Sequence, residues 1–215
     1  MLFRSADVAE LKELLQANNT PTSPTLVAWP SMSTASDFSG EPGKYSPYAV
    51  HIDKAPFEIP EIKERKAGIQ DEGSQVLAIA FAQAAQDQQP WLDLCAGPGG
   101  KASLLSFLSP VPLYANEISE ARAELVSQVV REDSIISVGD GREIAVNVNS
   151  ILADVPCTGL GALRRRPEVR WRRTAGDIPN LAKLQYELAA HAIDILPSGG
   201  IFAYATCSPH MAETR

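Results

Sequence analysis

The sequence predicts an α/β fold, a Rossmann-like doubly wound sheet with a small α+β N-terminal appendage. Short apolar runs typical of strands alternate with helical patterns from residue 70 onward, which is the signature of a parallel sheet. A glycine-rich turn follows the first of these strands, as in nucleotide-binding folds. The length of 215 residues suits one full domain, assigned to 66–215, and a smaller module at 1–65.

The N-terminal module is expected to hold one helix, one strand and a long loop. Residues 5–18 repeat apolar side chains at the spacing of one helix face, and Ser5 is a candidate helix cap. A short strand is predicted at 25–29. Residues 31–47 are rich in Ser, Gly and Pro and are expected to form a loop. No catalytic chemistry is visible here, so the module is interpreted as accessory.

The second region alternates helices and strands. The predicted helices are 74–86, 101–108, 120–130 and 178–196, and the predicted strands are 91–95, 113–116, 135–138, 151–153 and 200–205. Residues 141–150 alone separate the third and fourth strands of this series. A parallel crossover usually needs a dozen residues or more, so an irregular loop is expected at that point.

Composition narrows the class of protein. Neither a signal peptide nor an apolar run of membrane-spanning length is visible, and three cysteines are an odd, sparse set for a disulfide framework. We therefore expect a soluble, cytoplasmic protein with free thiols. The net charge of −7 argues weakly against nucleic-acid binding by the whole surface, yet six arginines fall within residues 164–173, opposed only by Glu168.

The end of the first parallel strand predicts a nucleotide site. Glycines in the turn allow a ligand to approach the backbone, and the following helix offers its N-terminal amides. Glu117 closes the second strand, where it could accept hydrogen bonds from ribose, and Asp140 closes the third, where an adenine would lie. Ordinary turn residues remain an alternative. Gly97, Gly99 and Ala102 also fit a dinucleotide pattern, so an NAD-dependent oxidoreductase is a second alternative.

Two thiols and one carboxylate follow neighbouring strands and decide between these alternatives. Asp154 and Cys157 follow the fourth strand, and Cys207 follows the fifth. Carbon 5 of cytosine is a poor nucleophile until a thiolate adds to carbon 6, and a second thiol can assist release of the product. Asp154 is placed to assist at ring nitrogen 3. Packing or redox roles are the alternatives for these thiols, and Cys95 is expected to pack inside its turn.

Four segments resemble, in order, the signatures of the Sun (Fmu-type) family of RNA cytosine-C5 methyltransferases, most nearly the bacterial enzymes that act on small-subunit ribosomal RNA. They are 70–75, 93–101, 154–161 with 164–173, and 206–213, and the likeness spans about residues 60–215. The resemblance implies a class I fold, S-adenosylmethionine as cofactor and RNA as partner. It also implies a larger N-terminal RNA-binding region, of which 1–65 would be a part, and a C-terminal hairpin that this sequence lacks.

The resemblance also implies roles for single residues. Cys207 is expected to attack the base, Cys157 to promote product release, and Lys101 to orient the base or Asp154. The methyl-donor site is expected to comprise Cys95, Ala96, Gly97, Pro98, Gly99, Gly100, Lys101, Glu117, Asp140 and Asp154. No metal or membrane is expected to take part, and the protein is expected to be a monomer.

The arginine run predicts an RNA surface beside the pocket. Its members are Arg164, Arg165, Arg166, Arg170, Trp171, Arg172 and Arg173. Arginine binds phosphate through two donors, and tryptophan can stack on an unpaired base. A solvated charged loop is the alternative. The target cytosine must be unpaired or flipped from its stack to reach Cys207, and a non-catalytic RNA-binding scaffold is the remaining alternative function.

Overall fold

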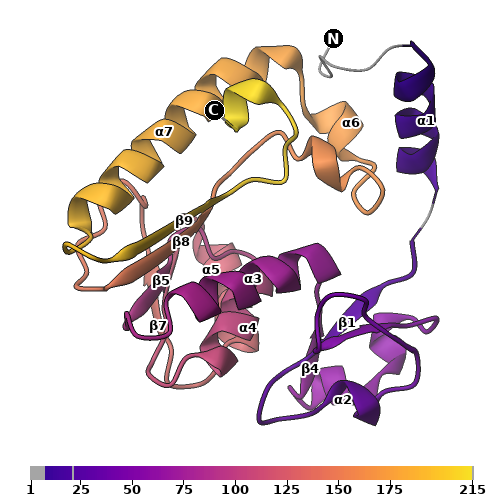
Figure 1. Cartoon of the computed structure of the whole chain (residues 1–215), viewed down its shortest axis with the longest axis horizontal. Coiled ribbons are helices and arrows are strands. Elements are labelled where there is room, and N and C mark those ends of the chain that lie inside the picture. Colours follow the sequence, from indigo (N-terminus) through magenta and orange to yellow (C-terminus); the bar gives the residue numbers. More distant parts are fainter. Residues whose placement is uncertain (1–7, 21, 215) are drawn as a thin grey trace.

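The computed structural model describes residues 8–20 and 22–214. This part of the chain forms a four-stranded antiparallel sheet near the N-terminus and a five-stranded parallel sheet in the remainder (Figure 1). None of the helices described is both long enough and apolar enough to cross a membrane. The Rossmann-like fold class predicted from the sequence is confirmed.

The N-terminal sheet has the strand order β2-β3-β1-β4. Its strands are β1 (Thr25–Ala28), β2 (Glu41–Pro42), β3 (Ala49–His51) and β4 (Ala67–Ile69), and helices α1 (Val8–Asn19) and α2 (Pro60–Lys63) accompany them. The sequence predicted α1 and β1. It missed the other strands, which have two or three residues, and α2, which is a single helical turn, because such segments are too short to show a periodicity. The candidate cap Ser5 lies outside the described residues.

Alternation along β1 explains how this module attaches to the rest of the chain. Leu26 and Ala28 pack into the module's own apolar cluster, whereas Val27 faces the larger core of the parallel domain. Trp29 continues that side and stacks on Phe107, with ring centroids 5.0 Å apart. The module is therefore packed directly against the parallel domain.

The parallel sheet has the order β7-β6-β5-β8-β9. Its strands are β5 (Trp91–Asp93), β6 (Tyr114–Glu117), β7 (Ile135–Val138), β8 (Ser150–Asp154) and β9 (Ile201–Ala205). The chain moves from β5 out to β7 and then returns to the other side of β5. This reversal leaves a crevice at the carboxyl ends of β5 and β8, where open α/β sheets bind their ligands.

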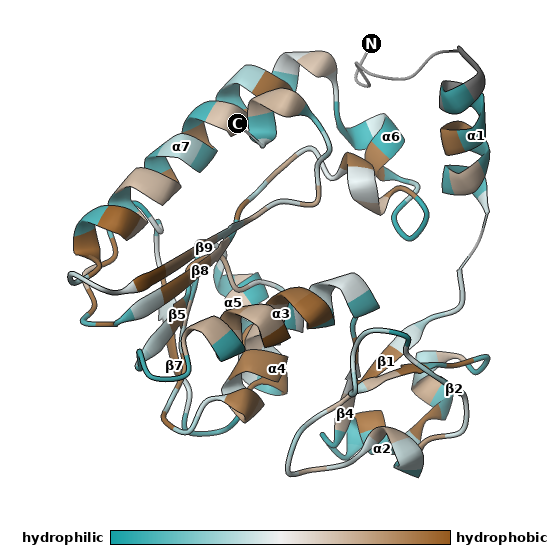
Figure 2. Cartoon of the chain, viewed as in Figure 1, coloured by the Kyte–Doolittle hydropathy of each residue, from teal (hydrophilic) through white to brown (hydrophobic). Residues whose placement is uncertain are grey.

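Helices cover both faces of this sheet. They are α3 (Glu72–Ala84), α4 (Gly100–Leu108), α5 (Glu120–Val129) and α7 (Ile178–Ile195), whereas the short helix α6 (Val169–Arg172) has no buried residue and lies away from the sheet (Figure 1). Trp91 and Leu152 face α3, α4 and α5, whereas Leu92 and Ile151 face α7. Figure 2 shows the resulting brown, apolar interior, which contrasts with the teal loop before α6.

The segment between β7 and β8 is irregular, as its length predicts. Val148 is fully buried, and Ile144 and Val146 pack beside it against the cluster that α7 covers. This loop therefore covers part of the sheet in the place where a crossover helix would otherwise lie.

Candidate active site

The glycine turn after β5 is held in a shape that larger residues would not allow. The Gly97 N–H donates to Glu117 Oε2 at 3.0 Å, and the Gly97 carbonyl accepts a hydrogen bond from Arg122. A side chain at Gly97 would fall on the Glu117 carboxylate. Gly99 has a φ of 109°, and a side chain there would collide with Val129. The turn thus leaves exposed backbone in front of the N-terminus of α4.

Acidic residues close the next two strands. Glu117 is 3% exposed, accepts the Ser119 N–H at 3.0 Å and pairs with Arg122 at 3.4 Å. Asp140 accepts three hydrogen bonds from the Arg142 guanidinium, the shortest of 2.6 Å, and this partner lowers the pKa of Asp140 to about 2. Both predicted ribose and adenine acceptors therefore lie at the sheet edge as carboxylates fixed by arginines.

One polar residue that sequence reasoning missed ties the three strand ends together. The Asn116 side-chain amide donates to the carbonyls of Leu94 at 3.2 Å and Gly139 at 3.1 Å, and its oxygen accepts from the Ser137 hydroxyl at 2.9 Å. Asn116 lies in β6 directly before Glu117, where the strand ends. An asparagine within a predicted strand is the sequence feature that could have indicated this role.

Asp93, at the end of β5, is buried without a full set of partners. It is 1% exposed, and its Oδ1 has no hydrogen-bond partner among the described residues. Burial raises the pKa of Asp93 to about 7, with a further contribution from the charge of Asp154. A buried carboxyl with an unused oxygen is suited to a ligand that brings a hydrogen-bond donor to the glycine turn.

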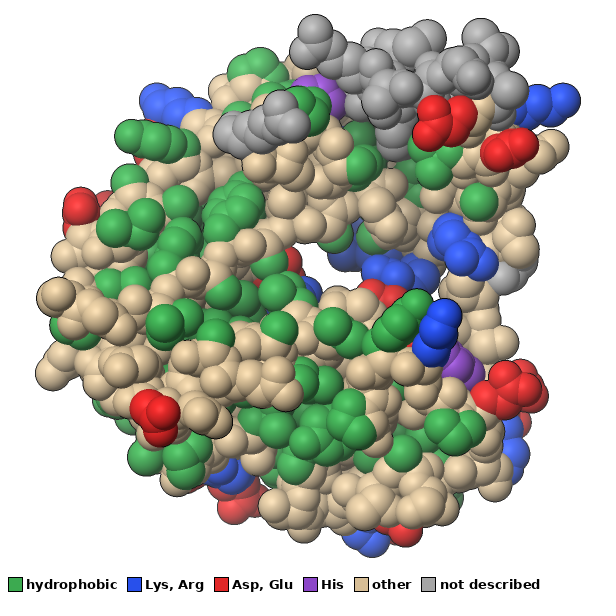
Figure 3. All heavy atoms as spheres, viewed as in Figure 1, with side chains coloured by type: hydrophobic (Ala, Val, Ile, Leu, Met, Phe, Trp, Pro, Cys, Tyr) green, Lys and Arg blue, Asp and Glu red, His purple; other side chains and the backbone are tan. Residues whose placement is uncertain are grey.

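Lys101 links the glycine turn to the acid after β8. Its ammonium donates to Asp154 Oδ2 at 2.6 Å and to the Ser74 hydroxyl at 3.4 Å. These groups line a cavity of about 430 Å³ together with Arg165 and Cys207. Figure 3 shows a hollow in this face of the molecule with blue Lys and Arg side chains gathered along its rim.

The two predicted thiols lie in contact. Cys157 Sγ and Cys207 Sγ are 3.3 Å apart, although 50 residues separate them in sequence. The Cys207 thiol is exposed and lines the cavity, whereas Cys157 is half-buried and is not among the lining residues. The Gly161 N–H donates to the Cys207 carbonyl at 2.8 Å, which ties the two turns together.

The thiol pair shares its protons unequally. The hydrogen bond from Cys207 lowers the pKa of Cys157 to about 6, with help from the Thr206 hydroxyl and the Gly159 N–H and against the effect of burial. The same bond, with burial, raises the pKa of Cys207 well above its ordinary value. The pair therefore loses its first proton near pH 6 and keeps the second. A hydrogen bond in which Cys207 is the donor favours Cys157 as the thiolate of the pair.

Cys95 differs from these two thiols. It is half-buried and packs beside Leu92 and Leu94 in the cluster that α7 covers. Burial raises the pKa of Cys95 well above its ordinary value. Cys95 is not among the residues that line the cavity, so its role in the turn is one of packing.

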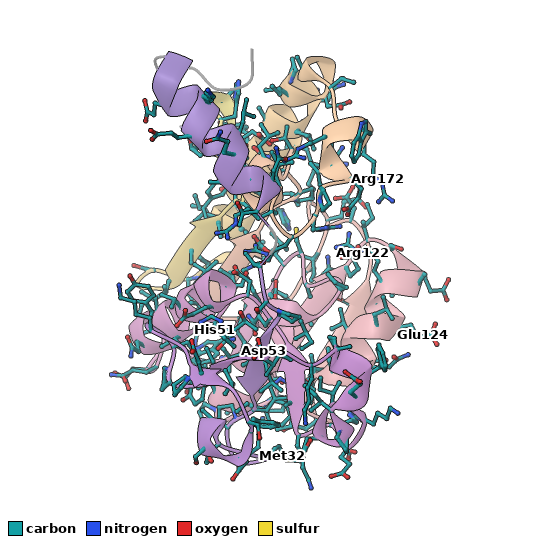
Figure 4. All side chains as sticks on the ribbon, turned by 90° about the vertical axis from the view of Figure 1, so that its right-hand side faces the viewer. Met32, His51, Asp53, Arg122, Glu124 and Arg172 are labelled. Carbon is teal, nitrogen blue, oxygen red and sulfur yellow. The ribbon has the colours of Figure 1, made fainter. Side chains whose placement is uncertain are left out.

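The arginine run divides into three groups. Arg164 and Arg170 donate to the carbonyls of Thr20 at 3.3 Å and Asn18 at 3.1 Å, at the C-terminal end of α1. Arg165 pairs with Asp71 at 2.6 Å beside the cavity. The rest of the run is exposed: Arg166, which pairs with Glu168, and Trp171, Arg172 and Arg173. Figure 4 shows Arg172 projecting from α6 away from the body of the molecule.

Comparison with known proteins identifies the family. A family model described as 16S rRNA methyltransferase RsmB/F matches residues 80–215. The chain belongs to the RsmB/F family. This confirms the Sun-type resemblance drawn from the sequence motifs, and it removes the NAD-dependent oxidoreductase as an alternative.

Two curated relatives and one solved structure agree with membership in the RsmB/F family. A Mycobacterium tuberculosis protein named as a methyltransferase is 44% identical over 97% of this chain and 49% of its own length. Ribosomal RNA small subunit methyltransferase B of Escherichia coli is 33% identical over 84% of this chain and 44% of its own length. The chain thus spans about half the length of these relatives. The crystal structure of PH0851 shares the fold, with a TM-score of 0.82 and 24% identity over 96% of this chain and 51% of that one.

S-adenosylmethionine is the cofactor that the RsmB/F family implies, and the residues present fit it. The cradle at Gly97 and Gly99 is one that a Cβ atom would fill. The carboxylates of Glu117 and Asp140 stand at the next two strand ends, and the unused oxygen of Asp93 lies at the first. This donor set suits a ligand with ribose hydroxyls and an ammonium group.

Proposed function

We propose that this chain carries the catalytic site of an S-adenosylmethionine-dependent RNA cytosine-C5 methyltransferase that acts on small-subunit ribosomal RNA through a covalent cysteine–carbon 6 intermediate. The contact between Cys157 and Cys207, beside a cavity lined by Lys101 and Asp154, carries the proposal. RsmB/F membership supports methyl transfer to RNA. The relatives named ribosomal RNA small subunit methyltransferase B support the ribosomal substrate.

The first step forms the covalent bond. Cys207 gives its thiol proton to the Cys157 thiolate, and the Cys207 sulfur adds to carbon 6 of the cytosine as the carbon 5–carbon 6 double bond opens. The Lys101 ammonium and the Asp154 carboxylate, 2.6 Å apart, hydrogen-bond the ring on the side of nitrogen 3 and balance the charge that develops there. S-adenosylmethionine, when bound, supplies the methyl group that carbon 5 takes up.

The second step releases the product. Once the bond has formed, Cys157 passes its proton to solvent and can then accept the proton from carbon 5. The bond between carbon 6 and the Cys207 sulfur breaks, and its electron pair returns to Cys207. One proton moves back between the thiols, and the pair regains its starting state. This sequence gives each thiol one role.

Replacing the thiols one at a time tests the proposal. With small-subunit ribosomal RNA and S-adenosylmethionine, Cys157→Ala should accumulate a protein–RNA species that survives a denaturing gel, because release is blocked after the bond has formed. Cys207→Ala should form none, and neither should Cys95→Ala, which loses a thiol outside the pair. Absence of the species in Cys157→Ala, or its presence in Cys207→Ala, would contradict the mechanism. A non-catalytic RNA-binding scaffold predicts no adduct in any of these variants.

We further propose that the exposed part of the arginine run binds the RNA backbone. Arg172 and Arg173 are exposed and pair with no acidic side chain among the residues that the structure describes, whereas Arg164 and Arg170 are directed to the end of α1. Trp171 is 79% exposed and offers a ring for stacking. These exposed side chains are the ones expected to contribute to salt-dependent binding.

A further inference from the structure

A single buried carboxylate joins the two turns that carry the thiols. Glu213 is 2% exposed and ends the short helical turn η5 (Met211–Glu213). Its Oε1 accepts from the Thr158 N–H at 2.8 Å and from the Gln185 side-chain amide at 3.1 Å. Its Oε2 accepts from the Thr158 hydroxyl at 2.6 Å and from the Ser208 hydroxyl. These four bonds match the acceptor capacity of one carboxylate.

The donors are the residues that directly follow the thiols. Thr158 follows Cys157, and Ser208 follows Cys207, and their hydroxyls are themselves 2.9 Å apart. Residues from different strands are therefore held by one group. Thr158, in the turn that carries Cys157, donates two of the four bonds, and Ser208, in the turn that carries Cys207, donates one.

The Cys157 turn depends on this network from both sides. The Pro156 carbonyl accepts from the Gln185 amide at 2.8 Å, and Gln185 donates to Glu213 as well. On the other side of Cys157, the Thr158 N–H donates to Glu213. The backbone hydrogen bond from Gly161 restrains the Cys207 carbonyl. The peptide groups on either side of Cys157 are restrained by the Glu213 network instead.

The charge of Glu213 has no cationic partner among the residues that the structure describes. Burial would by itself raise the pKa of Glu213, but the bonds from Ser208 and Thr158 hold that pKa below its ordinary value, so the group stays ionised. Bonds to an ionised acceptor are shorter and stronger than bonds between neutral groups. Burying a charge that has only neutral hydrogen-bond donors around it costs free energy, so it is a poor way to stabilise a fold. The direct effect of Glu213 is instead to fix the positions of its donors.

We propose that Glu213 is a positioning residue that holds the Cys157 and Cys207 sulfur atoms in contact through Thr158 and Ser208. Its consequence for methyl transfer rests on the proposed function, whereas its effect on the distance between the thiols does not. Removing the carboxylate should let the two turns move apart. In Glu213→Gln the side-chain NH₂ group would face groups that are themselves hydrogen-bond donors, so this variant cannot form all four bonds.

The test uses the rate at which the two thiols form a disulfide with the oxidant diamide, measured by mass spectrometry. This rate depends on how often the sulfur atoms reach bonding geometry. Glu213→Gln should slow it about tenfold, and should lower methylation turnover on ribosomal RNA by a similar factor, because a small misplacement of reacting groups has effects of this size. Affinity for S-adenosylmethionine should not change, since the glycine turn lies outside the network.

Glu72→Gln is the matched control. Glu72 also accepts two backbone N–H groups, from Tyr45 at 2.5 Å and Ser46 at 3.0 Å, but it serves the N-terminal module. The Glu72→Gln variant should have a lower melting temperature than the wild type and an unchanged rate of disulfide formation. A Glu213→Gln variant that matches Glu72→Gln in both melting temperature and disulfide rate would overturn the proposal.

Two further measurements keep the test decisive. If Glu213→Gln does not fold, Ser208→Ala removes a single donor and should still slow disulfide formation; an unchanged rate would refute the proposal. If the wild-type protein forms the disulfide readily but transfers no methyl group to RNA, the proposed function fails and the positioning role is judged by the disulfide rates alone.

Discussion

The thiolate character of Cys157 should depend on Cys207. Cys207 is the largest of the influences that lower the pKa of Cys157 to about 6, ahead of the hydrogen bonds from Thr206 and Gly159. Replacing Cys207 with alanine removes that donor and leaves burial to act in the opposite direction. We expect the pH midpoint for alkylation of Cys157 to rise from about 6 toward its ordinary value near 9.

The midpoint is more informative than the rate at one pH. A thiol with a pKa of about 6 is about 90% thiolate at pH 7, whereas one with a pKa near 9 is about 1% thiolate. The more basic thiolate is also intrinsically more nucleophilic by roughly 20-fold, given a Brønsted slope of about 0.45. These effects partly cancel, so at pH 7 the alkylation rate of Cys157 should fall only about fourfold. The plateau at high pH should rise by the full factor of roughly 20.

The assay is alkylation with iodoacetamide from about pH 5 to about pH 10, with each cysteine-containing peptide quantified by mass spectrometry. Cys207→Ser keeps a hydroxyl donor in place of the thiol and should hold the midpoint of Cys157 below that of Cys207→Ala. Cys95 should react slowly in every variant, because burial raises its pKa. A wild-type midpoint above about pH 8, or the same midpoint in wild type and Cys207→Ala, would refute the proton sharing described for the pair.

Three further predictions concern other parts of the site. Burial of Asp93 gives the folded state a proton up to a pKa of about 7 that the unfolded state loses near 4, so stability should fall by about 4 kcal/mol as pH rises through that window; urea unfolding at both ends should show this fall in wild type and not in Asp93→Asn. Gly99→Ala should lower the free energy of unfolding by about 1–3 kcal/mol, because its φ is 109° and Val129 blocks the side chain, whereas Gly139→Ala, which meets open space, should change it little; equal effects would contradict the strain. Arg172→Gln should reduce the salt slope of RNA binding by about 1, and an equal reduction by Lys63→Gln, on α2, would remove Arg172 from the RNA surface.

The sequence could predict the fold because its periodicities are local. The alternation of apolar strands and amphipathic helices is visible residue by residue, and it located β5 to β9 with α4, α5 and α7, but not the one-turn helix α6. Segments such as β2 (Glu41–Pro42) and β3 (Ala49–His51) have too few residues to show a period. They exist because β3 pairs with β1 and β2 then pairs with β3, and pairing between distant segments has no local signal.

The site divides in the same way. The rule that parallel strands end at one edge placed Asp154, Cys157 and Cys207 together without coordinates. No comparable rule predicts that Glu213 returns to bridge two turns, because its position depends on where η5 packs against α7. The ties of Arg164 and Arg170 to α1 are hidden for the same reason. The spacing of residues in the sequence predicts which strand a residue follows. Only the packing of the folded chain decides which side chains are then in contact.

Strand order also explains why the thiols come from β8 and β9. Lys101 follows the glycine turn directly. The site proposed for the methyl donor and the lysine that pairs with Asp154 therefore both lie at the N-terminus of α4. The order β5-β8-β9 puts Asp154 between that turn and Cys207. A base held by Asp154 would then present one side of its ring toward the donor and the other toward Cys207. A nucleophile placed at the end of β5 would occupy the site proposed for the methyl donor, whereas thiols that follow β8 and β9 lie on the other side of Asp154 from that site.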